Sequence, residues 1–301
     1  IGCTNQSKPI IVTPANYATS VDKVTEIMIH DIFSPPVASR IFAYPNVAAY
    51  EIIASNNDKY NSLSGQVHGL SQIPEFKGEK GTLYPQLAAL IAHMDVSKEL
   101  IFSEDKIIEL RDSLYTVWKT TNENEFEIAK EYGLEVANHI KLWLDKDNYK
   151  QTRTMPKYTV TTDDPSKWQP TPPSYMDGIE PHWSKIRTFV IDSASQFKPI
   201  PPPPFSLEKD SQFFKELMEV YDIRNATTLK GDNSEEIAIA QFWDCNPYVS
   251  VTRGHLMFAT KKITPGAHWI GIVKIAAKKT NSNFDDTVYA YTKTSLAIAD
   301  A

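Results

Sequence analysis

Apolar side chains recur at intervals of three and four residues over most of the chain, which is the pattern of helices with one buried face. Two adjacent stretches, 103–120 and 126–143, show this pattern most clearly. The apolar stripe of the first stretch consists of Ile107, Leu110, Leu114 and Val117. The stripe of the second stretch consists of Phe126, Ala129, Gly133, Val136, Ile140 and Trp143. Because only a short connection separates them, we expect the two helices to pack as an antiparallel pair.

Three further helices are predicted before this pair, over residues 21–32, 37–54 and 83–93. The second follows Pro35 and Pro36, which suit the first turn of a helix because a proline there loses no intrahelical hydrogen bond. Pro45 lies inside the same predicted helix, where it removes one hydrogen bond, and so predicts a kink.

Several helix starts carry a capping signal. Ser103 can cap the helix that follows it, and Asn233 with Glu236 has the spacing of a capping box. Pro265 opens a helix that we expect to run to about Lys279, and Asn283 is expected to cap the last one. The helix expected after Ser206 carries the stripe Phe213, Phe214, Leu217, Met218 and Tyr221.

The last predicted helix has no stop signal. Its stripe is Phe284, Val288, Tyr291, Ser295 and Ile298, and residues 297–301 include neither glycine nor proline nor a basic last turn. The sequence therefore predicts that the chain is cut inside this helix.

Helical periodicity disappears over residues 147–206, which contain eleven of the twenty prolines. Alternating residues at 157–161 predict a short strand, and Pro201 to Pro204 predict an extended polyproline segment. Eight aromatic residues also lie in this stretch: Tyr149, Tyr158, Trp168, Tyr175, Trp183, Phe189, Phe197 and Phe205. A disordered linker carries little apolar surface, so we expect a structured excursion packed on the helices.

Composition is that of a globular protein, with 42% hydrophobic and 23% charged residues. No apolar run approaches the roughly 18 residues of a membrane-spanning helix. The net charge of -6 argues against nucleic acid as a partner, because phosphate binding needs a basic face. We predict a mainly all-α helical bundle with a tether at 1–18, a helical region at 19–146, the excursion at about 147–206, and a second helical region at 207–301.

The two cysteines lie in different settings, and a disulfide between them is not expected. Cys245 follows a helix-like run at 238–244 and is predicted to be a buried thiol. Cys3 follows Gly2 and precedes a polar stretch, as in a lipoprotein cut beside its lipidated cysteine. We therefore expect a bacterial envelope or periplasmic location with a lipid on Cys3. An unacylated Cys3 in mass spectra of membrane-extracted protein would contradict this expectation.

Familiar catalytic motifs are missing from the sequence. The seven histidines form no metal-binding pair, and neither H-E-x-x-H nor C-x-x-C occurs. Nothing matches the nucleophile turn of serine hydrolases or the glycine loops that bind nucleotides. His93 and His139 lie on predicted helices, where a hydrogen-bonded histidine is a more common finding than a metal ligand.

The excursion and its flanks carry a family resemblance. Its residues are the run 168–175, Glu180-Pro181-His182-Trp183, Arg187-Thr188-Phe189, and 196–206, followed downstream by Phe242-Trp243-Asp244 and 286–301. This succession resembles the bacterial vanadium-dependent haloperoxidase-like members of the type 2 phosphatidic acid phosphatase superfamily.

The resemblance implies a helical bundle that holds vanadate or phosphate between lysine, arginine, serine, glycine and histidine groups. With vanadate, the implied substrates are peroxide and a halide. With phosphate, the implied reaction is hydrolysis of a phosphomonoester through a phosphohistidine, which makes an acid phosphatase the alternative. A non-catalytic envelope lipoprotein that binds a ligand is a third alternative, from outside the enzyme class.

The active-site signature of that family is a lysine seven residues before Arg-Pro, then Pro-Ser-Gly-His, then an arginine shortly before the last histidine. Three segments approach it. Lys146 and Arg153 have the spacing without the proline; Ser64-Gly65 is separated from His68 by two extra residues; and Arg253-Gly254-His255 lacks the serine. We therefore assign no catalytic, cofactor-binding or metal-binding residue, and we expect vanadate to belong to a longer parent enzyme and this chain alone to be inactive.

His182, Trp183 and Arg187 form a polar and aromatic group that could border a substrate channel. The structural alternative is favoured. In it, Arg187 stacks on Trp183 or pairs with Glu180 and so fixes the loop.

Overall fold

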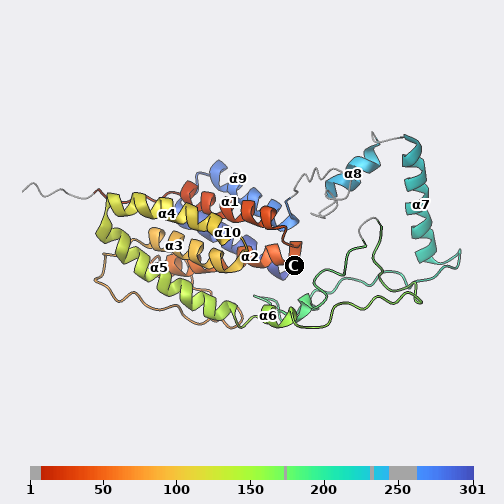
Figure 1. Cartoon of the computed structure of the whole chain (residues 1–301), viewed down its shortest axis with the longest axis horizontal. Coiled ribbons are helices and arrows are strands. Elements are labelled where there is room, and N and C mark those ends of the chain that lie inside the picture. The colour runs from red at the N-terminus through yellow and green to blue at the C-terminus, as the bar shows by residue number, and fades with distance from the viewer. Residues whose placement is uncertain (1–7, 173–174, 231–233, 244–262) are drawn as a thin grey trace, which may run out of the picture.

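The computed structural model describes residues 8–172, 175–230, 234–243 and 263–301, and this part of the chain is built from helices (Figure 1). The β pairing in the described ranges is an isolated bridge between Ser64 and Val67. The predicted all-α fold is confirmed. The helices are α1 (Pro14–Asp31), α2 (Pro35–Ala54), α3 (Pro85–Leu100), α4 (Glu104–Thr121), α5 (Glu123–Leu144), α6 (Tyr149–Thr152), α7 (Gln212–Lys230), α8 (Glu235–Trp243), α9 (Pro265–Lys279) and α10 (Phe284–Asp300), with a short 3-10 turn η1 (Trp183–Lys185).

Helices α2 and α3 form the centre of the bundle. Every residue of 37–53 in α2 and of 87–97 in α3 is buried. A helix that is buried on all sides must be surrounded by other helices. Accordingly, α2 packs against α3 and α10, and α3 packs against α5 on its other side.

Proline begins four of the bundle helices, at Pro14, Pro35, Pro85 and Pro265. Its fixed φ suits the first helical position. Helix α1 consequently starts at Pro14, seven positions before the predicted Val21, and helix α3 continues beyond His93 to Leu100. The predicted helices were therefore too short, α1 at its start and α3 at its end.

The predictions for α2, α9 and α10 are closer to the structure. Helix α2 passes through Pro45 and continues to Ala54 without a break. Helix α9 has the predicted bounds, and the side chain of Asn283 accepts a hydrogen bond from the Asp286 N–H as the cap of α10.

The predicted cap at Ser103 is wrong in its chemistry. Ser103 occupies the N-cap position of α4, but its side chain makes no cap hydrogen bond. Its hydroxyl donates instead to Asp31 Oδ1 at 2.5 Å, and its N–H donates to Asp31 Oδ2 at 2.9 Å. The side chain therefore joins the end of α1 to the start of α4.

Helices α4 and α5 meet at Asn122 and turn back on each other (Figure 1). The predicted stripe of α5 is confirmed, since all six of its residues are buried. In α4 the predicted Val117 is 58% exposed, and Trp118 is buried in its place. A step of four residues from Leu114 places Trp118 on the buried face of α4.

The described residues of 147–206 are largely irregular (Figure 1). The strand predicted at 157–161 is wrong, because this segment pairs with no neighbouring strand in the described residues. Phe189 is buried and Trp183 packs against the core, whereas Trp168, Tyr175 and Phe197 are exposed. Tyr149 also packs against the core, so residues near the start and in the middle of the excursion contribute to the bundle.

Several predicted features lie outside the described residues: Cys3, the cap at Asn233, Cys245, and Arg253 with His255. Helix α8 has another capping group, since Ser234 Oγ accepts the Ile237 N–H at 3.2 Å. Within the part of the chain that the structure describes, no helix is both long and apolar enough to cross a membrane.

Gly133 sets the distance between α5 and α3. A Cβ added there would lie 2.7 Å from the Ala88 carbonyl oxygen. We predict that Gly133→Ala lowers the free energy of unfolding by about 1 kcal/mol, because overpacking of ~1–3 kcal/mol outweighs the gain in helix propensity of ~1 kcal/mol. Urea denaturation followed by circular dichroism measures the change.

The matched control is Gly271→Ala in α9, where an added Cβ meets nothing within 4 Å. The same replacement should raise stability there by about 0.5–1 kcal/mol through helix propensity alone. Equal effects at the two glycines would contradict a packing role for Gly133.

Candidate functional site

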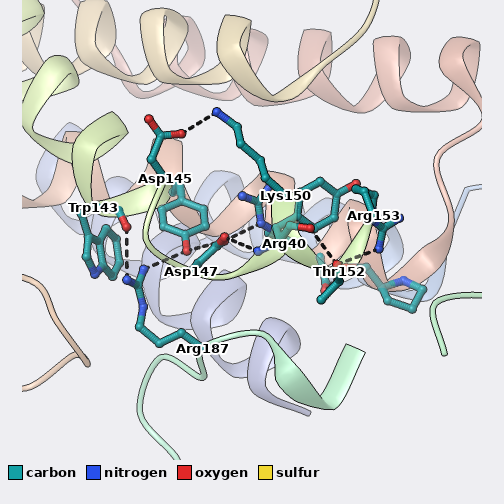
Figure 2. A network of polar contacts seen from close by, with 12 residues as sticks. Arg40, Trp143, Asp145, Asp147, Lys150, Thr152, Arg153 and Arg187 are labelled. Carbon is teal, nitrogen blue, oxygen red and sulfur yellow. Dashed lines mark hydrogen bonds and ion pairs between the residues drawn. The ribbon is translucent and has the colours of Figure 1, made fainter. Parts of the chain in front are cut away.

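A buried ion pair joins the start of α2 to the end of α5. Arg40 Nε donates to Asp147 Oδ2 at 2.7 Å, and the two side chains are 8% and 2% exposed (Figure 2). The hydroxyl of Tyr44, one turn along α2, donates to the same oxygen at 2.9 Å. The other carboxylate oxygen accepts the Tyr149 N–H at 2.8 Å. Three donors and one opposite charge thus compensate for burial of the carboxylate.

Arg187 approaches the ion pair from the excursion (Figure 2). Its Nη2 donates to the hydroxyl of Tyr44 at 3.0 Å, and its Nη1 donates to the Trp143 carbonyl oxygen at 3.1 Å. Its guanidinium carbon lies 4.7 Å from the centroid of the Trp143 ring. The backbone N–H of Arg187 donates to the backbone carbonyl of Asp147 at 2.9 Å. Arg187 therefore fastens the excursion to the end of α5.

The predicted partners of Arg187 are corrected by this geometry. Trp183 packs instead edge-on against Tyr149, with 6.4 Å between ring centroids. Glu180 pairs with Arg153, whose Nη1 donates to Glu180 Oε1 at 2.8 Å. The fixing role expected for Arg187 is present, but Trp143 and Tyr44 are the side chains that provide it.

The Tyr44 hydroxyl links Arg187 to the Asp147 carboxylate. Burial raises its pKa above the usual range, and the nearby negative charge of Asp147 raises it further. The hydroxyl therefore stays protonated, accepting from Arg187 while donating to Asp147.

A loop at 186–191 connects this network to the end of α10. The Asp300 carboxylate accepts the N–H groups of Phe189, Val190 and Ile191 at 2.7, 2.7 and 3.2 Å. On its other side, the Phe189 carbonyl accepts the His68 N–H at 2.9 Å. A small cavity of about 50 Å³ lies between the loop, the ion pair and Asp300.

The residues around this cavity do not fit a bound vanadate. Arg40 and Arg187 supply two positive charges, but Asp147 and Asp300 supply two negative charges to the same lining. The Arg40 guanidinium is already held by Asp147, and no histidine is among the lining residues. A tetrahedral oxyanion needs free donors and net positive charge, so this network is a structural one.

The two near-miss motifs in the described residues are also engaged elsewhere. Arg153 is paired with Glu180 and lies 4.5 Å from the centroid of the Tyr149 ring. His68 lies with Nδ1 3.2 Å from both oxygens of Thr188, and Ser64 Oγ donates to the Leu70 carbonyl at 3.4 Å. Neither motif gathers the groups of an oxyanion site.

The described histidines likewise form no metal site. His93 is buried on α3 with Nδ1 2.9 Å from Ser20 Oγ, and burial lowers its pKa to about 3, which keeps it neutral. His139 on α5 contacts Ser71, and His182 Nε2 lies 2.7 Å from the Pro156 carbonyl oxygen. No group of three or more potential metal ligands occurs in the ranges that the structure describes.

Arg40, Tyr44, Asp147 and Asp300 were not singled out from the sequence. Arg40 did carry a signal, because it is a charged residue within a segment that is otherwise largely apolar, and such a charge must find a partner if the segment is buried. No local pattern indicated which acid that partner would be, since Asp147 is 107 positions away.

No family model and no curated protein sequence matches the chain. A solved structure does match it, described as the crystal structure of the first bacterial vanadium-dependent iodoperoxidase. The sequence identity is 65%, the TM-score is 0.91, and the match covers 98% of this chain and 68% of that one. The chain belongs to the bacterial vanadium-dependent haloperoxidases.

The haloperoxidase resemblance expected from the excursion is thereby confirmed. About a third of the solved iodoperoxidase chain has no counterpart in this haloperoxidase chain. Only 2% of this chain lies outside the match, so most of the helical bundle and of the excursion lies in the part shared with the relative.

Replacing Arg40 tests the structural role of the network. We predict that Arg40→Met lowers the free energy of unfolding by about 3–5 kcal/mol, because it leaves the Asp147 charge buried without its partner. The double variant Arg40→Met, Asp147→Asn should recover part of this loss, since it removes the stranded charge. Urea denaturation at neutral pH measures both changes.

A matched control is Lys119→Met, which breaks the exposed pair with Glu123 at 3.2 Å. Its effect should be at most about 0.5 kcal/mol. If the Arg40 variant behaved like this control, the ion pair would not stabilise the bundle.

Proposed function

We propose that this chain is the scaffold part of a vanadium-dependent haloperoxidase that uses peroxide to oxidise a halide, with iodide as the preferred halide. The observation that carries the proposal is the match to the bacterial iodoperoxidase at 65% identity over 98% of the chain. At this identity, we expect the bundle and its buried network to have the same structural role in both proteins.

We further propose that the chain needs additional polypeptide to complete the oxyanion site. In the family, bound vanadate supplies the activation of peroxide. The pocket that contains His182 also contains Arg153 and Lys157, but these two cations pair with Glu180 and Asp177. The motif Pro-Ser-Gly-His does not occur in the sequence. In this proposal, the chain provides the helices against which the oxyanion site is built.

The direct test is iodide oxidation by the 301-residue chain in the presence of peroxide and orthovanadate. We expect no vanadate-dependent formation of triiodide and no saturable binding of vanadate in calorimetry, because Arg40 and Arg153 are paired with carboxylates and Arg187 is held by Trp143 and Tyr44. The longer iodoperoxidase relative is the positive control. Vanadate-dependent turnover by the 301-residue chain would refute the proposal that further polypeptide is needed.

A second assay separates the haloperoxidase from the acid phosphatase alternative. The 301-residue chain is extended by the uncovered third of the iodoperoxidase and is given a phosphomonoester or iodide with peroxide. Halide oxidation supports the proposed function. Phosphomonoester hydrolysis without halide oxidation would replace it with a phosphatase.

A further inference from the structure

Helix α9 carries two apolar stripes, each with a spacing of three residues. The buried stripe consists of Ala267, Ile270 and Val273. The exposed stripe consists of Trp269, Ile272 and Ile275. The exposed stripe is shifted by two positions from the buried one, and two positions turn an α-helix by about 200°, so the two stripes lie on opposite sides of α9.

The buried stripe fixes α9 on the bundle. Helix α9 packs against α10, α2 and α1. At its start the packing is close, because a Cβ added at Gly266 would lie 3.2 Å from Ile298 and 3.9 Å from Ser39. Lys274 also pairs with Asp22 of α1. Helix α9 is thus held on the outside of the bundle, and its second stripe is turned to solvent (Figure 1).

Helix α9 is basic, although the chain as a whole has a net charge of -6. It contains three lysines and no aspartate or glutamate. Lys278 and Lys279 form its last turn, and neither makes an ion pair with another described residue. Lys279 lies four positions after Ile275 and seven after Ile272, so it continues the exposed stripe.

The acids that follow α9 in the chain are engaged elsewhere. The Asp285 carboxylate accepts hydrogen bonds from Asn57 and Gln86. The Asp286 carboxylate pairs with Lys59. These carboxylates are therefore satisfied by other segments, and the positive charge at the end of α9 remains available to an anionic partner.

An exposed tryptophan and two isoleucines beside lysines fit the surface of a lipid bilayer. Such apolar side chains enter the boundary between headgroups and acyl chains, and the lysines contact anionic headgroups. Three partly exposed side chains supply much less than the roughly 800 Å² that each partner of a stable protein dimer contributes. A fluid bilayer, unlike a rigid protein, adapts to a stripe that is one helix wide.

We propose that the exposed stripe of α9, together with Lys278 and Lys279, is a docking surface for an anionic lipid bilayer. Trp269 and Ile275 enter the headgroup boundary, and the two lysines contact the phosphate groups of the lipids. The helix lies in the surface of the bilayer and does not cross it. The contact requires neither haloperoxidase activity nor a lipid on Cys3, so its test is independent of the proposed function.

Sedimentation with vesicles tests the contact. The 301-residue chain is made without a lipid on Cys3 and is mixed with vesicles of phosphatidylcholine, either alone or with an equal amount of phosphatidylglycerol. We expect at least about tenfold more protein on the anionic vesicles at low salt, and loss of this excess at high salt, because salt screens the attraction between lysines and headgroups. Equal binding to the two kinds of vesicle, or binding to neither, would overturn the proposal.

Two variants locate the contact on α9. Trp269→Ser with Ile275→Ser should lower binding to the anionic vesicles at least about tenfold, because it removes the apolar part of the surface. Lys278→Gln with Lys279→Gln should abolish the preference for anionic vesicles. All four residues are exposed, so urea denaturation should show little change in stability for either variant.

Matched controls replace exposed residues elsewhere. Val117→Ser with Leu142→Ser removes two apolar side chains from α4 and α5. Lys77→Gln with Lys80→Gln removes two lysines from the loop before α3. Both controls should bind the vesicles as the parent chain does. A loss of binding as large as that of the α9 variants would show that α9 is not the contact.

Tryptophan fluorescence shows which side chain enters the bilayer. Brominated lipids should quench part of the fluorescence of the parent chain, and this quenching should be absent from Trp269→Phe, which keeps an apolar side chain and so still binds. Quenching that persists in Trp269→Phe would place another exposed tryptophan, such as Trp168 or Trp243, in the bilayer and contradict the proposal. A dimer in light scattering that only Trp269→Ser with Ile275→Ser abolishes would assign the stripe to a second copy and overturn it.

Discussion

The carboxylate of Asp147 is buried, and the elements around it are arranged to satisfy its charge. Arg40 and Tyr44 reach it from α2, the Tyr149 N–H reaches it from the start of α6, and Arg187 reaches Tyr44 from the excursion. Removing one of these donors would leave a charged group in a medium where it cannot be hydrated. The excursion is therefore fixed to the bundle by electrostatics, although only a few of its aromatic side chains enter the core.

The loop at 186–191 also contacts the last turn of α10 that the structure describes. Asp300 accepts three consecutive backbone N–H groups at 189–191, so the end of α10 is anchored to the excursion, and through Arg187 to α2 and α5. A proline-rich segment suits this role, because proline lowers the conformational entropy that the loop loses on ordering.

The bundle helices differ from α7 and α8 in how their apolar residues are used. In α2 and α3, burial is continuous and the helices are supported on all sides. In α7 and α8, the same helical spacing leads to exposed faces. Periodicity specifies that a helix has an apolar face, whereas the identity of the surface that covers it depends on neighbours that are distant in sequence.

Local signals in the sequence determined most of the helices. The stripe of α5, the proline at the start of α9 and the cap at Asn283 each act within a few residues, so reading them needs no tertiary information. Errors arose where a distant group competes with a local one: Ser103 donates to Asp31 instead of capping α4, and residues 157–161 have no strand to pair with. The sequence also pointed to the haloperoxidase family through the excursion. Only the tertiary structure decided that Arg40 pairs with Asp147 and that Arg187 stacks on Trp143, because contacts between residues far apart in the chain depend on how the helices pack.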